Sequence, residues 1–323
     1  MSVGLGLAVA APALLLPFAY LVWWVDRFRL LPLSRFIAVF AMSSAAGLLL
    51  AARWPSAAGS GWRVVGPAMP LSSLAAERLP GDVADAARLV VLLLAVLVFL
   101  LARGRVETLL DGVVFGVAAG VGCALPAGWL LAESAPVVEG GELVVTALLP
   151  IVAGVVIGLT VAWARLLRRW RWRIPAVAVG AGAGVTVLVG ARLAAAAAGR
   201  IWVGMIVLVV AFAVAATVAV IVEVRVSRRE LAEEATLGVL PEWVIEVVPW
   251  YWRRIRASWW PRRDERRALA RLLVQLAFRK HQLRHLEGER ATLYSLEVGR
   301  LRERARRLLD PTRAPVAGKE LTE

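Results

Sequence analysis

Two histidines, four residues apart, are the first candidates for chemistry in this sequence. His281 and His285 frame the segment HQLRH, and the related HExxH motif places two imidazoles on one helix face to bind a metal ion. Gln282 stands where that motif has its general base, and an amide cannot take a proton from water. The arginines and the lysine around the two histidines would repel a dication. We therefore interpret HQLRH as the solvated basic face of a helix.

Acidic side chains at the ends of apolar stretches are the second set of candidates. Asp85 and Asp111 stand near the heads of long apolar runs, and Glu107 and Glu133 lie near other ends. A hydrolytic zinc ion needs about three protein ligands and a bound water, and these carboxylates do not supply such a set. We expect Asp111 to cap the N-terminus of its helix by accepting amide hydrogen bonds. A functional acid at Asp85 or Asp111 is the alternative.

Small residues recur at helical spacing in two apolar stretches. Gly112, Gly116 and Gly120 come once per helical turn, and Gly154 and Gly158 form a second such pair. A face of small residues lets a neighbouring helix approach closely within a membrane. We expect these glycines to be helix-packing residues.

The composition indicates a membrane protein that must position these residues on helices. The chain has 323 residues, of which 60% are hydrophobic, and its mean hydropathy is +0.71. Apolar stretches of about 17 or more residues are long enough to cross a bilayer as helices. We expect seven spans, near 4–24, 34–52, 86–102, 109–132, 143–164, 174–198 and 201–224.

The arginines predict how these spans are oriented. The connections 25–35, 103–107 and 165–173 are rich in arginine, whereas 133–142 carries three glutamates and no basic residue. Lys and Arg favour the cytoplasmic side of a membrane. The sequence therefore predicts an outside N-terminus and a cytoplasmic C-terminus, with only the link 53–85 carrying mixed charges.

The composition changes after Val224, so we divide the chain into a polytopic domain, 1–224, and a basic cytoplasmic tail, 225–323. The tail holds 22 Lys and Arg against 14 Asp and Glu, and such a segment is attracted to anionic lipid headgroups. Its stretch 247–263 interleaves tryptophan with arginine, a composition typical of a segment at headgroup depth. We expect four tryptophans at the membrane surface: Trp250, Trp252, Trp259 and Trp260. Nucleic-acid binding is the alternative that we do not favour.

The tail contains helical patterns. Apolar residues keep helical spacing in 264–286 and again in 289–309, with a break at Glu287 and Gly288. This predicts a helical hairpin, and a smaller helix near 228–237 is expected to end at Gly238. The expected apolar faces consist of Leu269, Leu272, Leu273, Leu276 and Leu283 in one helix, and Leu293, Leu296, Leu301, Ala305 and Leu308 in the other.

Several segments, in the same order, resemble the PrsW family of bacterial intramembrane metalloproteases. Segment 19–47 looks like its first span, which ends in an aromatic-rich D-R segment before an x-P-L link. Segment 103–122 is similar to its basic turn followed by D-G-x-x-[YF]-G-x-x-x-G-x-G, the most specific match. Segments 233–243 and 272–284 look like its C-terminal region. The resemblance implies an all-α polytopic fold in the bacterial cytoplasmic (inner) membrane and, where the ligands are complete, zinc-dependent proteolysis.

The metal ligands are where this chain departs from the family. The family's pattern has E-E-x-x-K at the head of span 3, and here Ala84 and Asp85 replace the glutamates while Arg88 replaces the lysine. Its F-x-x-x-E in span 4 falls on Cys123 and Ala127. Span 5 lacks the family's histidine. We expect no metal ion and no cofactor, although zinc would be needed if the chain were a protease.

Three functions fit these observations. The favoured hypothesis is a non-catalytic, pseudoprotease-like member that binds a membrane-spanning client or partner. The first alternative is an active intramembrane zinc metalloprotease. The second is an unrelated small permease or membrane scaffold. Against transport, we find no internal repeat, and Arg192 lies close enough to the end of its span to reach the surface.

Overall fold

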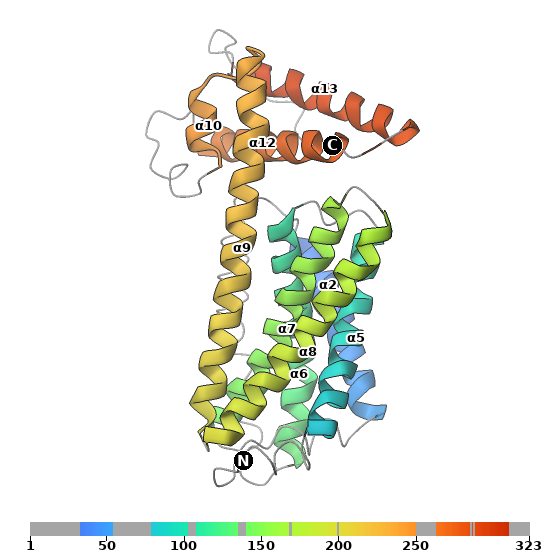
Figure 1. Cartoon of the computed structure of the whole chain (residues 1–323). Coiled ribbons are helices and arrows are strands. Elements are labelled where there is room, and N and C mark those ends of the chain that lie inside the picture. Colours follow the sequence, from blue (N-terminus) through green and yellow to red (C-terminus); the bar gives the residue numbers. More distant parts are fainter. Residues whose placement is uncertain are drawn as a thin grey trace. The chain divides into compact units, whose positions relative to one another are not determined.

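The computed structural model describes residues 33–53, 79–102, 108–134, 140–167, 170–198, 200–249, 263–284, 286 and 288–309. All regular secondary structure in these ranges is helical, as expected from the sequence (Figure 1). The chain divides into two compact units, Met1–Val220 and Ile221–Glu323. The dividing point lies within a helix and close to residue 224, where the composition changes.

The first unit is a bundle of long apolar helices. Its elements are α2 (Leu33–Arg53), α5 (Leu79–Ala102), α6 (Leu109–Ser134), α7 (Gly140–Leu166), a short 3-10 turn η1 (Trp170–Trp172), α8 (Arg173–Ala198) and the first part of α9 (Ile201–Thr236). Helix α6 contacts both α2 and α7, and α7 also contacts α5 and α8. Most residues of α6 from 109 to 124 are buried, which makes this helix the centre of the unit.

Three described helices are long and apolar enough to cross a membrane, and they lie in the segments Leu148–Arg165, Arg173–Ala198 and Trp202–Thr236. Shorter apolar stretches occur at Ile37–Leu48 and Leu109–Ala124. In α7, 72% of the most apolar segment is buried inside the protein. The corresponding buried share is 28% in α8 and 17% in α9. Helices α8 and α9 therefore present apolar side chains outward, as helices in contact with hydrocarbon do. The expected first span, 4–24, lies outside the described residues.

Helix α9 continues beyond the apolar stretch, which corrects the expectation of a separate helix at 228–237. It runs unbroken from Ile201 to Thr236, because the arginines and glutamates after Val224 are good helix formers and no glycine or proline interrupts them. The change in composition near residue 224 therefore does not mark a helix end. The helix ends just before Gly238, as expected from the sequence.

Gly238 ends α9 in the left-handed conformation, with φ 67°. Its amide donates to the carbonyl of Ala235 at 2.9 Å, and the amide of Val239 donates to the carbonyl of Glu234 at 3.0 Å. These two bonds form a Schellman motif, which satisfies carbonyls that would otherwise lack partners at the helix end. The chain turns here because glycine carries no Cβ penalty at positive φ.

The second unit packs around an apolar core of its own. Besides the end of α9 it contains α10 (Trp243–Val247), α12 (Arg263–Leu283) and α13 (Glu289–Leu309). Helices α12 and α13 contact each other, and Gly288, with φ 68°, lies between them. The leucines expected on the inner face of α12 at 269, 272, 273 and 276 are buried. Leu231 of α9 and Leu240 contribute to the same core.

The expected apolar face of α13 is partly wrong. Ala305 is buried and Leu301 packs against the core, but Leu293 and Leu296 are 60% and 58% exposed, and Leu308 is also exposed. Helical spacing allowed two neighbouring faces, and the one that meets the core is centred on Val298 and Ala305. The remaining leucines lie on the outer face of the helix.

Candidate functional sites

The acid that aligns with the family's metal ligands is paired within its own helix. Asp85 lies in the first part of α5, and its Oδ1 accepts a hydrogen bond from Nη1 of Arg88 at 3.0 Å. The Asp85 side chain is 13% exposed and that of Arg88 is 40% exposed. Ala84, the other aligned position, is exposed on the same helix and carries no ligand atom. A carboxylate held by a guanidinium in this way has its charge balanced without a metal ion.

The aligned positions of the fourth expected span lie in α6. Cys123 is buried, and its thiol donates to the backbone carbonyl of Ser43 in α2, with Sγ 3.6 Å from the oxygen. A Cβ added at the neighbouring Gly122 would come within 2.6 Å of the carbonyl oxygen of Phe40. This part of α6 is therefore packed closely against α2. Ala127 continues the same helix, and its side chain lies outside the described part of the structure.

Asp111 forms a capping box at the start of α6. Its Oδ2 accepts a hydrogen bond from the amide of Thr108 at 2.8 Å, and its own amide donates to Oγ1 of Thr108 at 3.1 Å. This reciprocal pair satisfies two amides at the helix N-terminus, where a carboxylate is also favoured by the helix dipole. Asp111 is buried. Its geometry is that of the cap expected from the sequence.

The glycine stripes of α6 and α7 meet each other directly. A Cβ at Gly112 would overlap the carbonyl oxygen of Gly158, and a Cβ at Gly116 would overlap that of Gly154. One turn further along, Gly120 lies against the backbone of Ile151. As the residue number rises along α6, the number of the residue that it contacts in α7 falls, so the two helices are antiparallel. Backbone contact of this kind needs residues without side chains.

Arg192 differs from its expected position at a membrane surface. It lies in the buried face of α8 and is 5% exposed, with Leu188 and Ala195 buried on the same face. Its side chain is buried in the first unit, which corrects the expectation that it reaches the surface.

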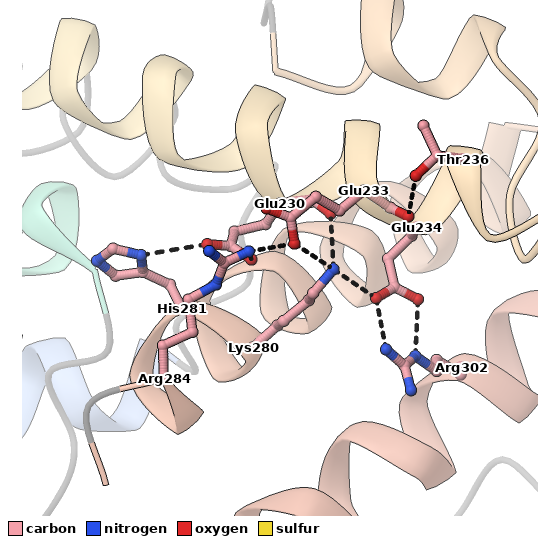
Figure 2. Close-up of polar contacts among 8 residues, drawn as sticks. All are labelled: Glu230, Glu233, Glu234, Thr236, Lys280, His281, Arg284 and Arg302. Carbon is pink, nitrogen blue, oxygen red and sulfur yellow. Dashed lines mark hydrogen bonds and ion pairs between the residues drawn. The ribbon is translucent and has the colours of Figure 1, made fainter.

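The described part of the HQLRH segment, residues 281–284, includes His281 and Arg284, which pair with carboxylates of α9, so it is not a solvated basic face as the sequence had suggested. His285 lies outside the described residues. Lys280, His281 and Arg284 point toward the end of α9 and meet three carboxylates there (Figure 2). The carboxylates belong to Glu230, Glu233 and Glu234. We refer to these six residues and Arg302 as the ion-pair cluster. It lies entirely in the second unit.

Glu234 holds two cations from two different helices. Its side chain is 1% exposed, and Arg302 of α13 binds both of its oxygens, with Nε 2.7 Å from Oε2 and Nη2 2.6 Å from Oε1. Lys280 Nζ lies 2.8 Å from Oε1. The two-point contact with arginine is the strongest geometry for such a pair. Glu234 thus connects α9, α12 and α13.

Glu230, one turn earlier in α9, is equally buried, with a side chain that is 0% exposed. Its Oε1 lies 3.3 Å from Nδ1 of His281, and its Oε2 accepts from Nη2 of Arg284 at 3.1 Å. Arg284 also pairs with Glu233, and Lys280 Nζ lies 3.1 Å from Glu233 Oε2. Removing one partner from a buried pair leaves an uncompensated charge, which costs about 3–5 kcal/mol.

The cluster shifts the protonation equilibria of its members. Burial by itself opposes ionisation of Glu234, but the hydrogen bonds from Arg302 and Lys280 outweigh it, so the pKa of this carboxyl is lowered. The hydrogen bond from Arg284 is the main cause that lowers the pKa of Glu233. The pKa values of Arg284 and Arg302 are raised, mainly by their hydrogen bonds to Glu233 and Glu234 respectively. The paired charged forms are favoured on both sides.

Gln282 and Arg279 form a separate group beside the cluster. Gln282 Oε1 accepts from Nη1 of Arg279 at 3.2 Å, so the amide at the general-base position of the motif acts as a structural acceptor. Arg279 also pairs with Glu297 at 3.0 Å and lies 5.1 Å from the ring centre of Tyr294. These contacts join α12 to α13.

Reasoning from the sequence missed the ion-pair cluster. The signal was present, because Glu230, Glu233 and Glu234 share one face of a helix at spacings of three and four residues, as do Lys280 and Arg284. Nothing local connects these two faces, which are about 50 residues apart in the chain. Among the described residues, no three side chains of His, Cys, Asp or Glu lie close enough together to hold a metal ion. The four surface tryptophans expected from the sequence lie outside the described residues.

The structure therefore defines a helical protein whose long apolar helices are of the kind that associate with membranes. A scan against protein-family models found no matching family, and searches of curated proteins and of solved structures found no match either. The resemblance to the PrsW family rests on the sequence motifs described above.

Proposed function

We propose that this chain is a multi-pass protein of the bacterial cytoplasmic membrane that binds a membrane-spanning client or partner and does not cleave peptide bonds. In this proposal it is a non-catalytic relative of the PrsW metalloproteases. Its helical framework serves as a binding surface, and its aligned ligand positions serve packing and charge balance.

The observation that carries the proposal is the Asp85–Arg88 pair. Asp85 is the only carboxylate at the aligned positions 84, 85 and 127. Its hydrogen bond to Arg88 at 3.0 Å joins residues of one helical turn, so the pair forms wherever α5 forms. A metal ion at Asp85 would have to displace this arginine or tolerate its charge. Both oppose the binding of a dication.

The surroundings of Cys123 and the glycine stripes support a packing role for the rest of the framework. Cys123 contacts the backbone of α2, and α6 meets α7 through glycine backbones. A zinc hydrolase needs ligands that hold the metal and keep one position open for water. Cys123 and the glycines of α6 instead bring α6 into direct contact with α2 and α7.

The proposal includes seven spans, an outside N-terminus and a cytoplasmic tail. The arginine-rich connections support this orientation. The tail, 225–323, is proposed to contain the α12–α13 hairpin and to lie at the cytoplasmic surface, where the arginines and tryptophans of its stretch 247–263 contact anionic lipid headgroups.

The decisive experiment measures zinc and proteolysis in the purified, detergent-solubilised protein. We expect substoichiometric zinc and no cleavage of a membrane substrate, and we expect Asp85→Ala to alter the folding or abundance of the protein instead of a proteolytic rate. Near-stoichiometric zinc that is lost in Asp85→Ala, together with substrate cleavage, would overturn the proposal.

A gain-of-function variant sharpens the same test. Changing Ala84, Asp85 and Ala127 to glutamate restores the family's carboxylates but not its histidine in span 5. We expect this triple variant to remain inactive unless a histidine is also placed in α7. Activity of the triple variant without that histidine would show that the ligand set has been misassigned.

A further inference from the structure

We propose that Arg225, Arg228 and Arg229 of α9 form a binding site for the phosphate groups of anionic phospholipids. The proposal rests on the membrane-spanning role of α9 and adds its lipid partner. It is independent of whether the chain cleaves peptides.

The first observation is the continuity of one face of α9. The exposed side chains Val214, Val218 and Ile221 follow one another at spacings of four and three residues. The next exposed positions on the same face are Arg225 and then Arg228 and Arg229. The outward face of one helix therefore changes from apolar to cationic within a single turn. That is the order of environments at the boundary between hydrocarbon and headgroups.

The other end of the apolar face of α9 also carries an aromatic and a cationic side chain. Trp202 is 51% exposed, and the guanidinium of Arg200 lies 6.0 Å from its ring centre. Tryptophan and arginine in contact are typical of the membrane–water interface. From Trp202 to Arg225 the helix rises about 34 Å at 1.5 Å per residue. This length matches a hydrocarbon core of roughly 30 Å with a small allowance for interfacial anchoring or tilt.

The second observation is that these arginines have no protein partner in the described structure. All three are exposed, and no hydrogen bond or ion pair to them is found among the residues that the structure describes. Other cations of the same unit are paired, as Arg302 is with Glu234 and Arg284 is with Glu230. The glutamates of α9 after residue 229 face these partners and not the three arginines.

The chemistry of the site follows from its donors. Three guanidinium groups within about one helical turn present planar forks of N–H donors, which suit the oxygens of a phosphate. Basic residues near an anionic bilayer contribute about 1 kcal/mol each. A phospholipid also places its acyl chains against the apolar side chains that precede the arginines, which a free phosphate ion cannot do.

The test compares lipid retention by the full-length protein in three forms. The forms are the wild type, the variant Arg225→Gln/Arg228→Gln/Arg229→Gln, and the matched control Arg300→Gln/Arg304→Gln/Arg306→Gln. The control removes the same charge from exposed arginines of α13. Each protein is solubilised with equal amounts of phosphatidylglycerol and phosphatidylcholine, and the bound lipid is identified by native mass spectrometry.

We expect the wild type to retain phosphatidylglycerol in preference to phosphatidylcholine, and the α9 variant to lose this preference by about tenfold or more. The α13 control should stay within about twofold of the wild type. An unchanged preference in the α9 variant, or an equal loss in the control, would overturn the proposal. Displacement of the lipid by excess inorganic phosphate alone would also overturn it, because the site would then bind a free anion.

Failure of this proposal is distinguishable from failure of the proposed function. A chain that does not span the membrane would be extracted from membranes by alkaline carbonate, and a protease would show zinc-dependent cleavage. If only the lipid site is wrong, the α9 variant remains in the membrane, shows no cleavage and retains the wild-type lipids.

Discussion

The helices of the first unit and those of the second are held together by different interactions. Helix α6 meets α7 through the backbones of glycines, as at Gly116 and Gly154. In the second unit, α9 meets α12 and α13 through an apolar core that is bordered by buried ion pairs such as Glu234 with Arg302. One chain therefore uses close backbone contact in one unit, and burial of leucines with paired charges in the other.

In the proposed topology the first unit lies in lipid and the second in water, and this gives the difference a physical reason. Between helices in lipid there is little hydrophobic driving force, so association depends on dispersion contacts that grow as the backbones approach. In water, apolar side chains gain by leaving the solvent, and buried charges must be paired. The change in composition near residue 224 marks the point where α9 passes from one kind of packing to the other.

The largest expected effect comes from filling the α6–α7 contact. Gly116→Val places a branched side chain where the backbone of Gly154 already lies, so the two helices must separate. We expect loss of most of the folded protein, measured as thermal stability in detergent by size-exclusion chromatography. Gly190→Val in α8 is the matched control, because nothing lies within 4 Å of a Cβ at that glycine. Equal losses in the two variants would contradict the account.

The second effect breaks the ion-pair cluster. Glu234→Gln keeps the size of the side chain but removes the anion that Lys280 and Arg302 share. Because Lys280 keeps its pair with Glu233 and Arg302 is partly exposed, we expect the second unit to be destabilised by about 1–3 kcal/mol. Hydrogen exchange in α12 and α13 of the full-length protein measures the loss. Glu303→Gln removes an exposed pair with Arg307 and should cost at most about 1 kcal/mol. If the two variants behave alike, the cluster does not stabilise the unit.

A third effect is a selective sensitivity to acid. The pKa values of Glu233 and Glu234 are lowered in the folded protein, so their stabilising contribution is complete above the ordinary glutamate pKa of about 4.3 and is lost as the pH falls through the folded values. Protection of α12 from hydrogen exchange, corrected for intrinsic rates, should fall over this range. Protection of the glycine contact between α6 and α7 should not. Glu234→Gln should flatten the pH dependence in α12, and an unchanged profile would contradict the assignment.

The smallest effect concerns the tail at the membrane surface. Replacing Trp259 and Trp260 with alanine should weaken the binding of the isolated segment 225–323 to anionic vesicles at low salt, because tryptophan side chains favour headgroup depth. Binding is measured by co-sedimentation. A tail that does not bind such vesicles at low salt would show that the surface interpretation is wrong.

Local patterns in the sequence predicted several features of both units. The cap at Asp111 is a contact between residues three positions apart, and the glycine stripes follow from a repeat of one residue per turn. The end of α9 at Gly238 is also a local signal. Features of this kind depend on neighbouring residues, so a single sequence contains them.

The cluster and the outer face of α13 depend on contacts between distant segments. Glu234 and Arg302 are 68 residues apart, and each sequence pattern alone is equally consistent with a solvated face. Leu293 and Leu296 have the spacing of a buried face, but the helix turns its other apolar side to the core. The position of Arg192 also follows from how α8 rotates against its neighbours.

The central claim is that α9 leaves the bilayer between Ile221 and Arg225, and cysteine labelling tests it most directly. Single cysteines replace Val210, Val214, Val218 or Leu237 in a Cys123→Ala background, and intact cells are treated with a membrane-impermeant maleimide before and after the cytoplasmic side is opened. We expect the three valine positions to resist labelling throughout, and Leu237→Cys to react only after opening. Labelling at the valine positions, or labelling of Leu237→Cys in intact cells, would contradict the account.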